Sequence, residues 1–198
     1  MLTDKEKYYN NLRSKFESYH PISDASWELL KSISLFEEVR KEELVVRISQ
    51  VAKKVFFICK GALRASFLDS EGNSYNKNLF LEGDLAGSTV SMLLNEPSKF
   101  EIEALEDSLL ISLKYGEYRK LINEHDDLKN YYIAYLEKNW VIEKEQREVS
   151  IVMENAKERY LKLLAKHPNI NKRIPQLHIA SHLGITPTQL SRIRKSLK

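Results

Sequence analysis

The stretch IPQLHIASHLGITPTQLSRIR, residues 174–194, decides the fold prediction for this chain. Pro175 suits the first position of a helix, and Gly184 can adopt the left-handed conformation that ends one. Thr186 can cap a second helix, and Pro187 fits the first position of that helix. Ala180 is small where two helices must cross closely. The stretch therefore predicts a helix-turn-helix.

The second of these helices carries an apolar side formed by Leu190, Ile193 and Leu197. Early side chains of a recognition helix reach base edges, and an arginine can bridge guanine O6 and N7. We expect Thr188, Gln189 and Arg192 to read bases, and the remaining polar side chains to contact phosphates. The candidate DNA-binding residues are Thr186, Thr188, Gln189, Ser191, Arg192, Arg194 and Lys195. A plain helical hairpin with solvated basic residues is the alternative interpretation.

The charge distribution favours DNA binding by the C-terminal part of the chain. The whole chain has a net charge of +3, but residues 157–198 hold ten Lys or Arg and one acid, a net charge of +9. The 21 basic and 27 acidic residues that remain in positions 1–156 give −6. A basic C-terminal unit on an acidic body is typical of nucleic-acid binding, because phosphates supply much of the binding free energy. A merely solvated basic surface would give the same charge.

A long helix is predicted over residues 127–155. Leu128, Tyr132, Leu136 and Trp140 recur every four residues, and Val149, Val152 and Met153 resume the stripe beyond the charged residues 143–148. Such a helix is about 40 Å long, at roughly 1.5 Å per residue, and exceeds what a small domain covers. We expect it to pair with a second copy in a homodimer. A core helix packed within one chain is the alternative.

The first part of the chain predicts a β-rich domain with two helices in front. The helices are expected over residues 4–19 and from Pro21 to Ile33. Short strands with turn signals between them follow at residues 44–48, 54–59, 62–68, 76–81, 100–105 and 109–113. A short helix starting at Gly87 or Ser88 interrupts the strands, and another covers residues 118–122. The expected units are residues 1–125, 126–155 and 156–198.

Several classes of protein are excluded by composition and motifs. No apolar run approaches the roughly 20 residues that cross a membrane. The N-terminus shows no secretory signal, so a cytoplasmic location is expected. Cys59 is the single cysteine, which rules out an internal disulfide or a four-thiolate cluster. Catalytic and phosphate-loop motifs are missing, and His178 and His182 lack a third metal ligand. We predict no enzyme activity, no metal and no cofactor.

The order of a β-roll, a long helix and a helix-turn-helix resembles the Crp/Fnr family of bacterial transcription regulators. The runs Ala156–Leu164, Ile179–Pro187 and Leu190–Arg194 are especially similar to its Bacteroidetes-type branch. The resemblance implies an α+β fold with an antiparallel β-roll sensor, a dimerisation helix and a C-terminal helix-turn-helix without an evident β-wing. It also implies a homodimer that reads near-palindromic double-stranded DNA, with RNA polymerase as a further partner.

The sequence departs from this family where the sensor would bind cyclic AMP. The resemblance implies a Gly-Glu pair for the ribose and an Arg-Ala pair for the cyclic phosphate, but Ser88 follows Gly87, and Ser98-Lys99 follow Pro97. A lysine replaces a bidentate guanidinium only as a point charge. The candidate effector pocket is Gly87, Ser88, Ser98 and Lys99, with an effector that is not cyclic AMP, is unknown or is absent. The alternative function is a ligand-binding or interaction module with a vestigial helix-turn-helix.

Overall fold

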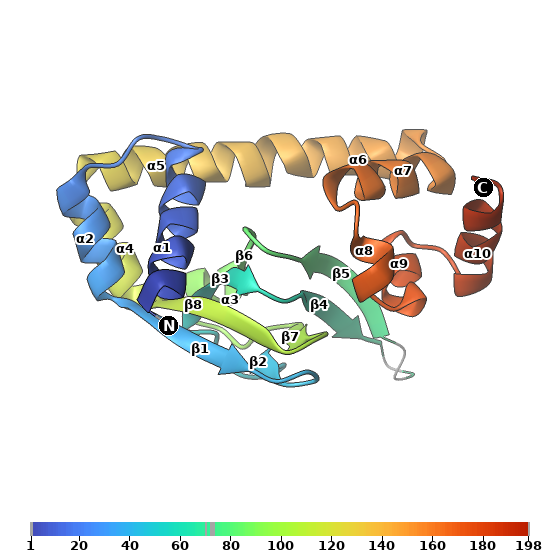
Figure 1. The fold of residues 1–198 in the computed structure, drawn as a ribbon, viewed down its shortest axis with the longest axis horizontal. Coiled ribbons are helices and arrows are strands. Elements are labelled where there is room, and N and C mark those ends of the chain that lie inside the picture. Colours follow the sequence, from blue (N-terminus) through green and yellow to red (C-terminus); the bar gives the residue numbers. More distant parts are fainter. Residues whose placement is uncertain (1, 70, 72–73, 198) are drawn as a thin grey trace.

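Two four-stranded antiparallel sheets fold over one another as a roll beneath a long helix, and a group of short helices closes one end (Figure 1). This computed structural model describes residues 2–69, 71 and 74–197, and it confirms the predicted α+β fold. The strand order is β1-β8-β3-β6 in one sheet and β2-β7-β4-β5 in the other. The strands are β1 (Ser34–Val39), β2 (Leu44–Val46), β3 (Lys54–Lys60), β4 (Leu63–Leu68), β5 (Ser74–Phe80), β6 (Leu85–Ala86), β7 (Glu101–Ala104) and β8 (Ser108–Lys114).

The helices precede, interrupt and follow the roll. The predicted N-terminal, inset and C-terminal helices are present with shifted ends. Their bounds are α1 (Leu2–Glu17), α2 (Asp24–Ser32), α3 (Thr89–Leu94), α4 (Tyr115–Glu124), α5 (Asp126–Leu136), the π-helical segment η1 (Glu137–Ile142), α6 (Glu143–Met153), α7 (Ala156–Lys166), α8 (Ile170–Arg173), α9 (Gln176–His182) and α10 (Pro187–Lys195).

Strand β3 is the centre of the fold because both of its faces are buried. Phe56 and Ile58 point into the roll and pack with residues of the second sheet. Phe57 and Cys59 point the opposite way and pack against the helical layer. Successive side chains of a strand alternate between faces, so a strand covered on both sides reads as a continuous apolar run. This is why β3 was predictable from sequence.

Two strands were not predicted. β1 pairs with β8 from Ser34↔Leu113 to Val39↔Ser108, and β6 pairs with β3 at Leu85 and Ala86. The middle of β1 carries Glu37, whose carboxylate accepts hydrogen bonds from Lys54 at 2.6 Å and from Ser112. Long-range pairing, rather than local β-propensity, makes this polar segment a strand.

The helical layer consists of α1, α2, α4 and α5, gathered at one end of the roll (Figure 1). Leu12 and Phe16 of α1 are 1% exposed, and the Phe16 ring stacks on Tyr131 with centroids 4.3 Å apart. Leu128 and Tyr131 of α5 are fully buried in the same cluster. The amphipathic N-terminal helix was predicted correctly, and it packs the start of the long helix against the roll.

The long helix continues from α5 through η1 to α6, as predicted for residues 127–155, although it ends at Met153. The apolar stripe that was predicted through Tyr132 and Trp140 needs correction. Tyr131 is buried instead, whereas Trp140 is 39% exposed. A π-helical turn accommodates an additional residue and so rotates everything that follows it. The apolar positions after η1 are therefore offset from the four-residue repeat that the sequence suggested.

The C-terminal helices pack around Tyr160, Ile179 and Leu190, which are at most 1% exposed. Gly184 has φ +69° in the turn between α9 and α10, which is the conformation expected of it. Two predictions need correction. Pro175 is the residue before α9 rather than its first residue, and Leu197 lies beyond α10 with 41% of its surface exposed. The side chain is past the last helical turn, so the core does not cover it.

The C-terminal helices also dock on the roll. Ala62, Leu81 and Leu105 of the roll belong to the same hydrophobic cluster as α9 and α10. The backbone N–H of Asn76 donates to Ser181 Oγ at 2.8 Å, and the Asn76 side-chain amide donates to the carbonyl of His178 at 2.9 Å. Strand β5 and helix α9 are thus fixed to one another.

Candidate DNA-binding surface and sensor cavities

The turn between α9 and α10 is fixed by its own side chains. Thr186 Oγ1 accepts from the backbone N–H of Gln189 at 3.2 Å, and Gln189 Oε1 accepts from the N–H of Thr186 at 2.9 Å. This capping box satisfies two N–H groups that a helix start leaves unpaired. The amide nitrogen of Gln176 also donates to the carbonyl of Pro187 at 2.6 Å. The oxygen of Gln189 is therefore engaged, and its amide NH₂ group is what it can offer to a ligand.

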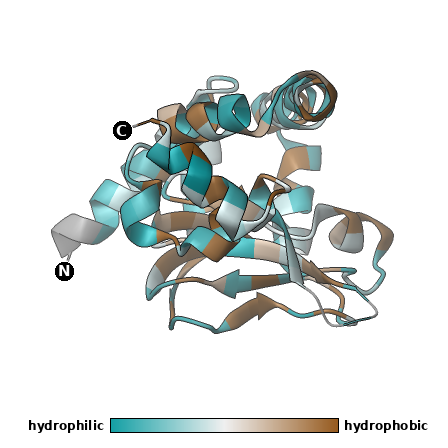
Figure 2. Cartoon of the chain, turned by 90° about the vertical axis from the view of Figure 1, so that its right-hand side faces the viewer, coloured by the Kyte–Doolittle hydropathy of each residue, from teal (hydrophilic) through white to brown (hydrophobic). Residues whose placement is uncertain are grey.

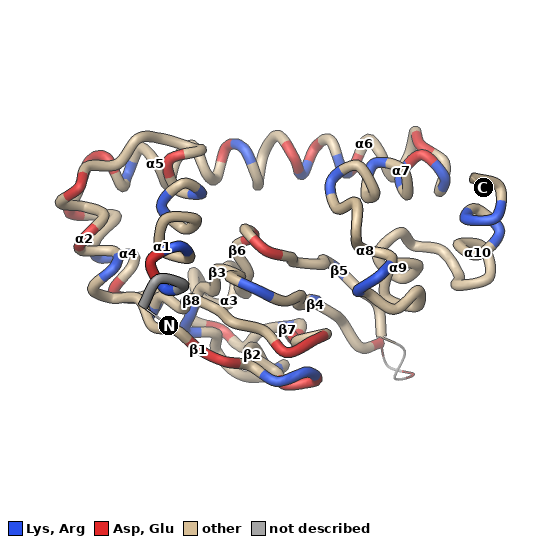
Figure 3. The backbone as a smooth tube through the Cα atoms, in the orientation of Figure 1, with Lys and Arg blue, Asp and Glu red and all other residues tan. Residues whose placement is uncertain are grey.

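The last turn of α10 carries basic residues (Figure 3). Within the described ranges, Arg192, Arg194 and Lys195 form no ion pair and no side-chain hydrogen bond with the protein. Arg192 and Lys195 are exposed, and Arg194 is half-buried. Thr188 is exposed and Ser191 is half-buried on the same helix. The structure thus brings the seven predicted residues together on one helix and its cap.

The predicted effector residues do not form a polar pocket. Ser88 is 1% and Ser98 is 3% exposed, and their hydroxyl oxygens are hydrogen-bonded at 2.9 Å. Ser98 Oγ also donates to the carbonyl of Phe100 at 2.6 Å. Lys99 is exposed, and Gly87 lies beside a different cavity. The two buried serines satisfy each other, so these hydroxyls are not available to a phosphate.

A cavity of about 540 Å³ lies between the roll, the long helix and the C-terminal helices. Its walls include Gly87 and Lys77 of the roll, Tyr135 and Arg147 of the long helix, and His182 of α9. Apart from Gly87, these residues were not predicted as a site. They are separated by up to 105 positions in sequence, so no local spacing indicates that they meet.

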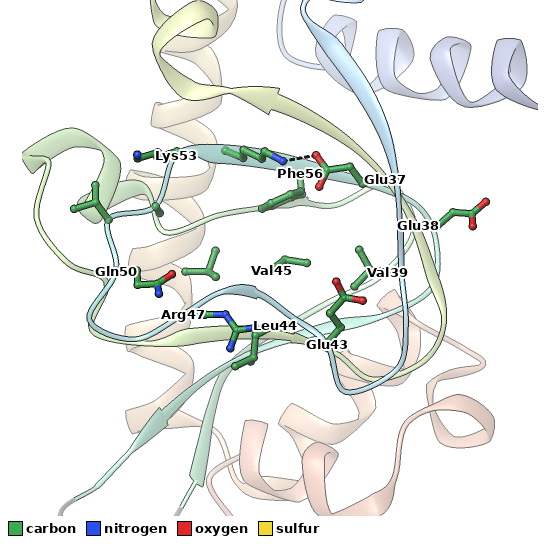
Figure 4. Close-up of a pocket in the computed structure, with 14 residues that line it drawn as sticks. Glu37, Glu38, Val39, Glu43, Leu44, Val45, Arg47, Gln50, Lys53 and Phe56 are labelled. Atoms are coloured by element: carbon green, nitrogen blue, oxygen red, sulfur yellow. Dashed lines mark hydrogen bonds and ion pairs between the residues drawn. The ribbon is translucent and has the colours of Figure 1, made fainter.

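A second cavity of about 320 Å³ opens beside β1, β2 and β3. Figure 4 shows Glu37 and its ion pair on one side, with Glu43 and Arg47 on the opposite side. The Glu37 carboxylate is bonded to Lys54, and Glu43 Oε2 accepts from the backbone N–H of Arg40 at 3.1 Å. These carboxylates already have partners within the fold, which assigns them a structural role.

The outer side of the long helix is apolar and uncovered by the rest of the chain. Figure 2, in which this helix is seen nearly end-on, shows hydrophobic segments on it. Ile142, Val149, Val152 and Met153 are between 53% and 82% exposed. The spacing from Ile142 to Val149 is seven residues, and Val152 or Met153 follows three or four residues later, as in a coiled-coil seam.

Other chemistry is limited in the described part of the chain. It contains no cluster of three or more His, Cys, Asp or Glu that could hold a metal ion. Burial raises the pKa of the Cys59 thiol to about 12, although a backbone contact with Ile111 opposes the shift. A thiol with so high a pKa is unreactive. None of the described helices is both long and apolar enough to span a membrane.

Comparisons with known proteins agree with this architecture. The sequence profile of the cyclic nucleotide-binding domain matches residues 36–125. FixK2 from Bradyrhizobium japonicum has a TM-score of 0.69 and 18% identity, with 83% of this chain and 84% of that chain covered. The c-di-GMP responsive global regulator CLP from Xanthomonas campestris has a TM-score of 0.65 and 12% identity, with 88% and 91% covered. The Thermus thermophilus catabolite activator protein has a TM-score of 0.56 and 19% identity, with 90% of this chain and 85% of that chain covered.

No curated protein matches this chain significantly in sequence. At identities below 20%, the structural matches establish a likeness of fold. The shared part extends beyond the roll, because each match covers more than four fifths of this chain. The Bacteroidetes-type branch that the sequence suggested stays a prediction.

Proposed function

We propose that this protein is a DNA-binding transcription regulator of the Crp/Fnr type, which binds a near-palindromic site as a homodimer. The observation that supports this most directly is α10, a capped helix whose Arg192, Arg194 and Lys195 have no ion-pair partner among the described residues. Unpaired cations on an exposed helix are arranged for phosphates and guanine edges.

Dimerisation through the long helix is part of the proposal. A stripe that includes Ile142, Val149 and Val152 exposes apolar surface that a single chain does not bury, and large exposed apolar patches mark interaction sites. A second copy paired along this stripe would place two α10 helices on one face. In proteins of this kind the two recognition helices enter successive major grooves about 34 Å apart.

The roles of the individual side chains follow from their positions. Arg192 and Thr188 are the proposed base-reading residues, with Gln189 contributing its amide NH₂ group. Ser191, Arg194 and Lys195 are proposed to contact phosphates, and Thr186 caps the helix. The proposal includes either no effector or an unknown one other than cyclic AMP, because Ser88 stands where the family has the glutamate and Ser98-Lys99 where it has the Arg-Ala pair.

The test starts by selecting bound sites from a random DNA pool and measuring affinity for the selected site by fluorescence anisotropy. Replacing Arg192 with alanine should weaken binding by about 1–3 kcal/mol and relax the preference at one base position. Lys120→Ala removes the same charge from the exposed surface of α4 and should leave the affinity unchanged.

Raising the salt concentration should also weaken binding steeply, because counterions are released from the DNA. The alternative is a ligand-binding or interaction module with a vestigial helix-turn-helix. It would be supported if no DNA sequence is enriched from the pool, or if DNA affinity is unchanged both by Arg192→Ala and by salt.

A further inference from the structure

The C-terminal helices would be free to turn relative to the roll if only the chain itself connected them. Helix α6 ends at Met153, and α7 begins at Ala156. The two residues between them have extended backbone conformations, with ψ 140° at Glu154 and 166° at Asn155. A few residues at the end of an element are enough to act as a hinge. Contacts between the C-terminal helices and the roll therefore decide where α10 points.

Arg173 forms a charged contact across this junction. It is the last residue of α8 and lies beside Ile170 and Ile174, which are 0% and 3% exposed and fix this short helix in the C-terminal core. Its guanidinium donates to both carboxylate oxygens of Glu82, at 2.8 Å each, and to the carboxylate of Glu106. Glu82 lies between β5 and β6, and Glu106 lies between β7 and β8. One side chain of the C-terminal helices thus joins two turns of the roll.

The geometry of this contact is that of a strong ion pair. Bidentate pairing of a guanidinium with a carboxylate is the arrangement in which a partly exposed pair still contributes to stability. Glu82 Oε1 also accepts from the backbone N–H of Gly61 at 2.9 Å, which holds the carboxylate in place. Burial would raise the pKa of Glu82, but the hydrogen bonds from Arg173 and Gly61 outweigh it and lower that pKa. Hydrogen bonds with Glu82 and then Glu106 raise the pKa of Arg173, so both shifts favour the charged forms.

A second contact holds α9 at a separate place on the roll. Asn76 of β5 is 7% exposed, and it donates from its backbone to Ser181 and from its side chain to the carbonyl of His178. Asn76 Oδ1 accepts from Arg64 at 3.2 Å, and Arg64 pairs with Glu103 at 2.6 Å. The asparagine is therefore itself held by its neighbours. Two anchors at separate points prevent a rotation that either anchor alone would permit.

The docked arrangement leaves α10 open to solvent. Arg192 and Lys195 are exposed, and the hydrogen bonds of Arg173 and Asn76 across the junction use no side chain of α10. Docking on the roll therefore presents the recognition helix rather than covering it.

The distance between two half-sites is fixed by the DNA. Successive major grooves are about 34 Å apart, and adding one base pair moves a half-site by about 3.4 Å and by roughly a tenth of a helical turn. A dimer tolerates such a change only if its recognition helices can move relative to one another. Fixed docking of the C-terminal helices on the roll therefore favours one half-site spacing over its neighbours.

We propose that Arg173 is a positioning residue for DNA binding. By pairing with Glu82 and Glu106 it fixes the C-terminal helices on the roll. In a homodimer it thereby sets the distance between the two α10 helices, and with it the half-site spacing that the protein prefers. Arg173 acts through the position of α10 and not by touching DNA, because its guanidinium is taken up by the two carboxylates. This inference rests on the proposed DNA-binding function.

Half-site spacing is the measurement that tests the proposal. The site selected from the random pool is compared, by fluorescence anisotropy, with versions that have one base pair more or one fewer between the half-sites. Wild-type protein should prefer the selected spacing about tenfold, within the usual cost of a mismatched site. Arg173→Gln should bind the selected site about fivefold more weakly, equivalent to about 1 kcal/mol, and should lose most of the spacing preference.

Removing the two carboxylates separates positioning from direct contact with DNA. Glu82→Gln/Glu106→Gln deletes two negative charges, which by itself strengthens binding to phosphates. If Arg173 acts by positioning, this double variant should instead bind the selected site more weakly and lose the spacing preference. Adding Arg173→Gln to it should cause no further loss, because all three residues act through one contact.

The matched control is Glu28→Gln/Glu38→Gln, which makes the same change of charge at two exposed residues of α2 and β1. This control should keep the spacing preference, and its DNA affinity should be equal to or higher than that of the wild type. Thermal melts verify that every variant folds.

The backbone amide of Asn76 reports docking without DNA. Its N–H donates to Ser181 Oγ across the junction, so its exchange with solvent requires α9 to move away from β5. Hydrogen exchange followed by NMR on the full chain should be about fivefold faster at Asn76 in Arg173→Gln, the same ratio as the loss of affinity. The amides of β8, which lies inside its sheet, should keep their rates.

An unchanged spacing preference in Arg173→Gln would overturn the proposal. Tighter DNA binding by Arg173→Gln would also overturn it, because the contact would then hold α10 away from DNA. Tighter binding by Glu82→Gln/Glu106→Gln would mean that Arg173 contacts DNA itself. In each of these cases the proposed function stands. A chain that selects no DNA site loses the proposed function instead, and the exchange rate of Asn76 then decides separately whether Arg173 docks the helices.

Discussion

Helix α10 and the segment around α3 both carry polar side chains, but those side chains differ in burial and in hydrogen bonding. Near α3, the hydroxyls of Ser88 and Ser98 are buried and bonded to each other. On α10, Arg192 and Lys195 are exposed and have no ion-pair partner in the described chain. Buried polar groups must be satisfied within the fold, whereas exposed ones are free to bind. The hydroxyls that flank α3 therefore stabilise the fold, whereas the basic groups of α10 are those that we propose to bind DNA.

The largest expected effect breaks the support beneath α10. Leu190 is fully buried in the C-terminal cluster, so Leu190→Ala should destabilise this region by about 2–5 kcal/mol. DNA binding should be lost because α10 no longer packs on α9. Leu177→Ala is the control, since Leu177 on α9 is 60% exposed. Hydrogen exchange of the α9 and α10 amides measures the local stability of the Leu190→Ala and Leu177→Ala variants. Equal protection in the two variants would contradict the assignment of Leu190 as a core residue.

Acidification should loosen the junction between the C-terminal helices and the roll. Burial lowers the pKa of His167, His178 and His182, to about 4 for His182. Unfolded histidine titrates near 6.5, so the unfolded chain binds more protons at pH 5, and stability falls as the pH drops below about 6.5. For His182 the loss is on the order of 2 kcal/mol by pH 4.5.

This pH dependence is measured by urea denaturation of the full chain between pH 7.5 and 4.5. His182→Gln removes the titrating ring and should flatten the curve. An identical slope in that variant would show that His182 is not buried in its neutral form.

Removing the hydrogen bond between Ser88 and Ser98 should have a smaller effect, confined to the roll. Ser98→Ala leaves Ser88 Oγ and the carbonyl of Phe100 without their partner and should cost about 1–3 kcal/mol of stability. The affinity of the folded variant for DNA should not change. A double-mutant cycle with Ser88→Ala isolates the pair. Additive losses in the cycle would mean that the two hydroxyls do not interact.

The smallest effect tests the cap of α10. Thr186→Ala removes the acceptor for the Gln189 N–H and should cost about 1 kcal/mol, whereas Thr186→Ser should retain the cap. Thr188→Ala changes an exposed threonine on the same helix and should leave the melting temperature nearly unchanged. If both alanine variants melt alike, the capping box contributes nothing to stability.

The sequence was informative wherever local chemistry decides the structure. Gly184, Thr186 and Pro187 each favour a particular backbone conformation, and the resulting turn is present as predicted. β3 was visible because its apolar run is buried on both faces. β1 was missed because Glu37 and Glu38 hide its periodicity, and its pairing with β8 spans about 75 positions.

The sequence by itself therefore determined the α+β fold class, the two helices around Gly184 and the basic character of the C-terminal part. Only the tertiary structure decided that Ser88 and Ser98 satisfy each other, and that Lys77, Arg147 and Lys166 share one cavity. Helix caps and turns depend on neighbours in sequence, which a single chain reveals directly. Pairing between buried hydroxyls and convergence of distant cations depend on how the elements pack, and no local pattern records that.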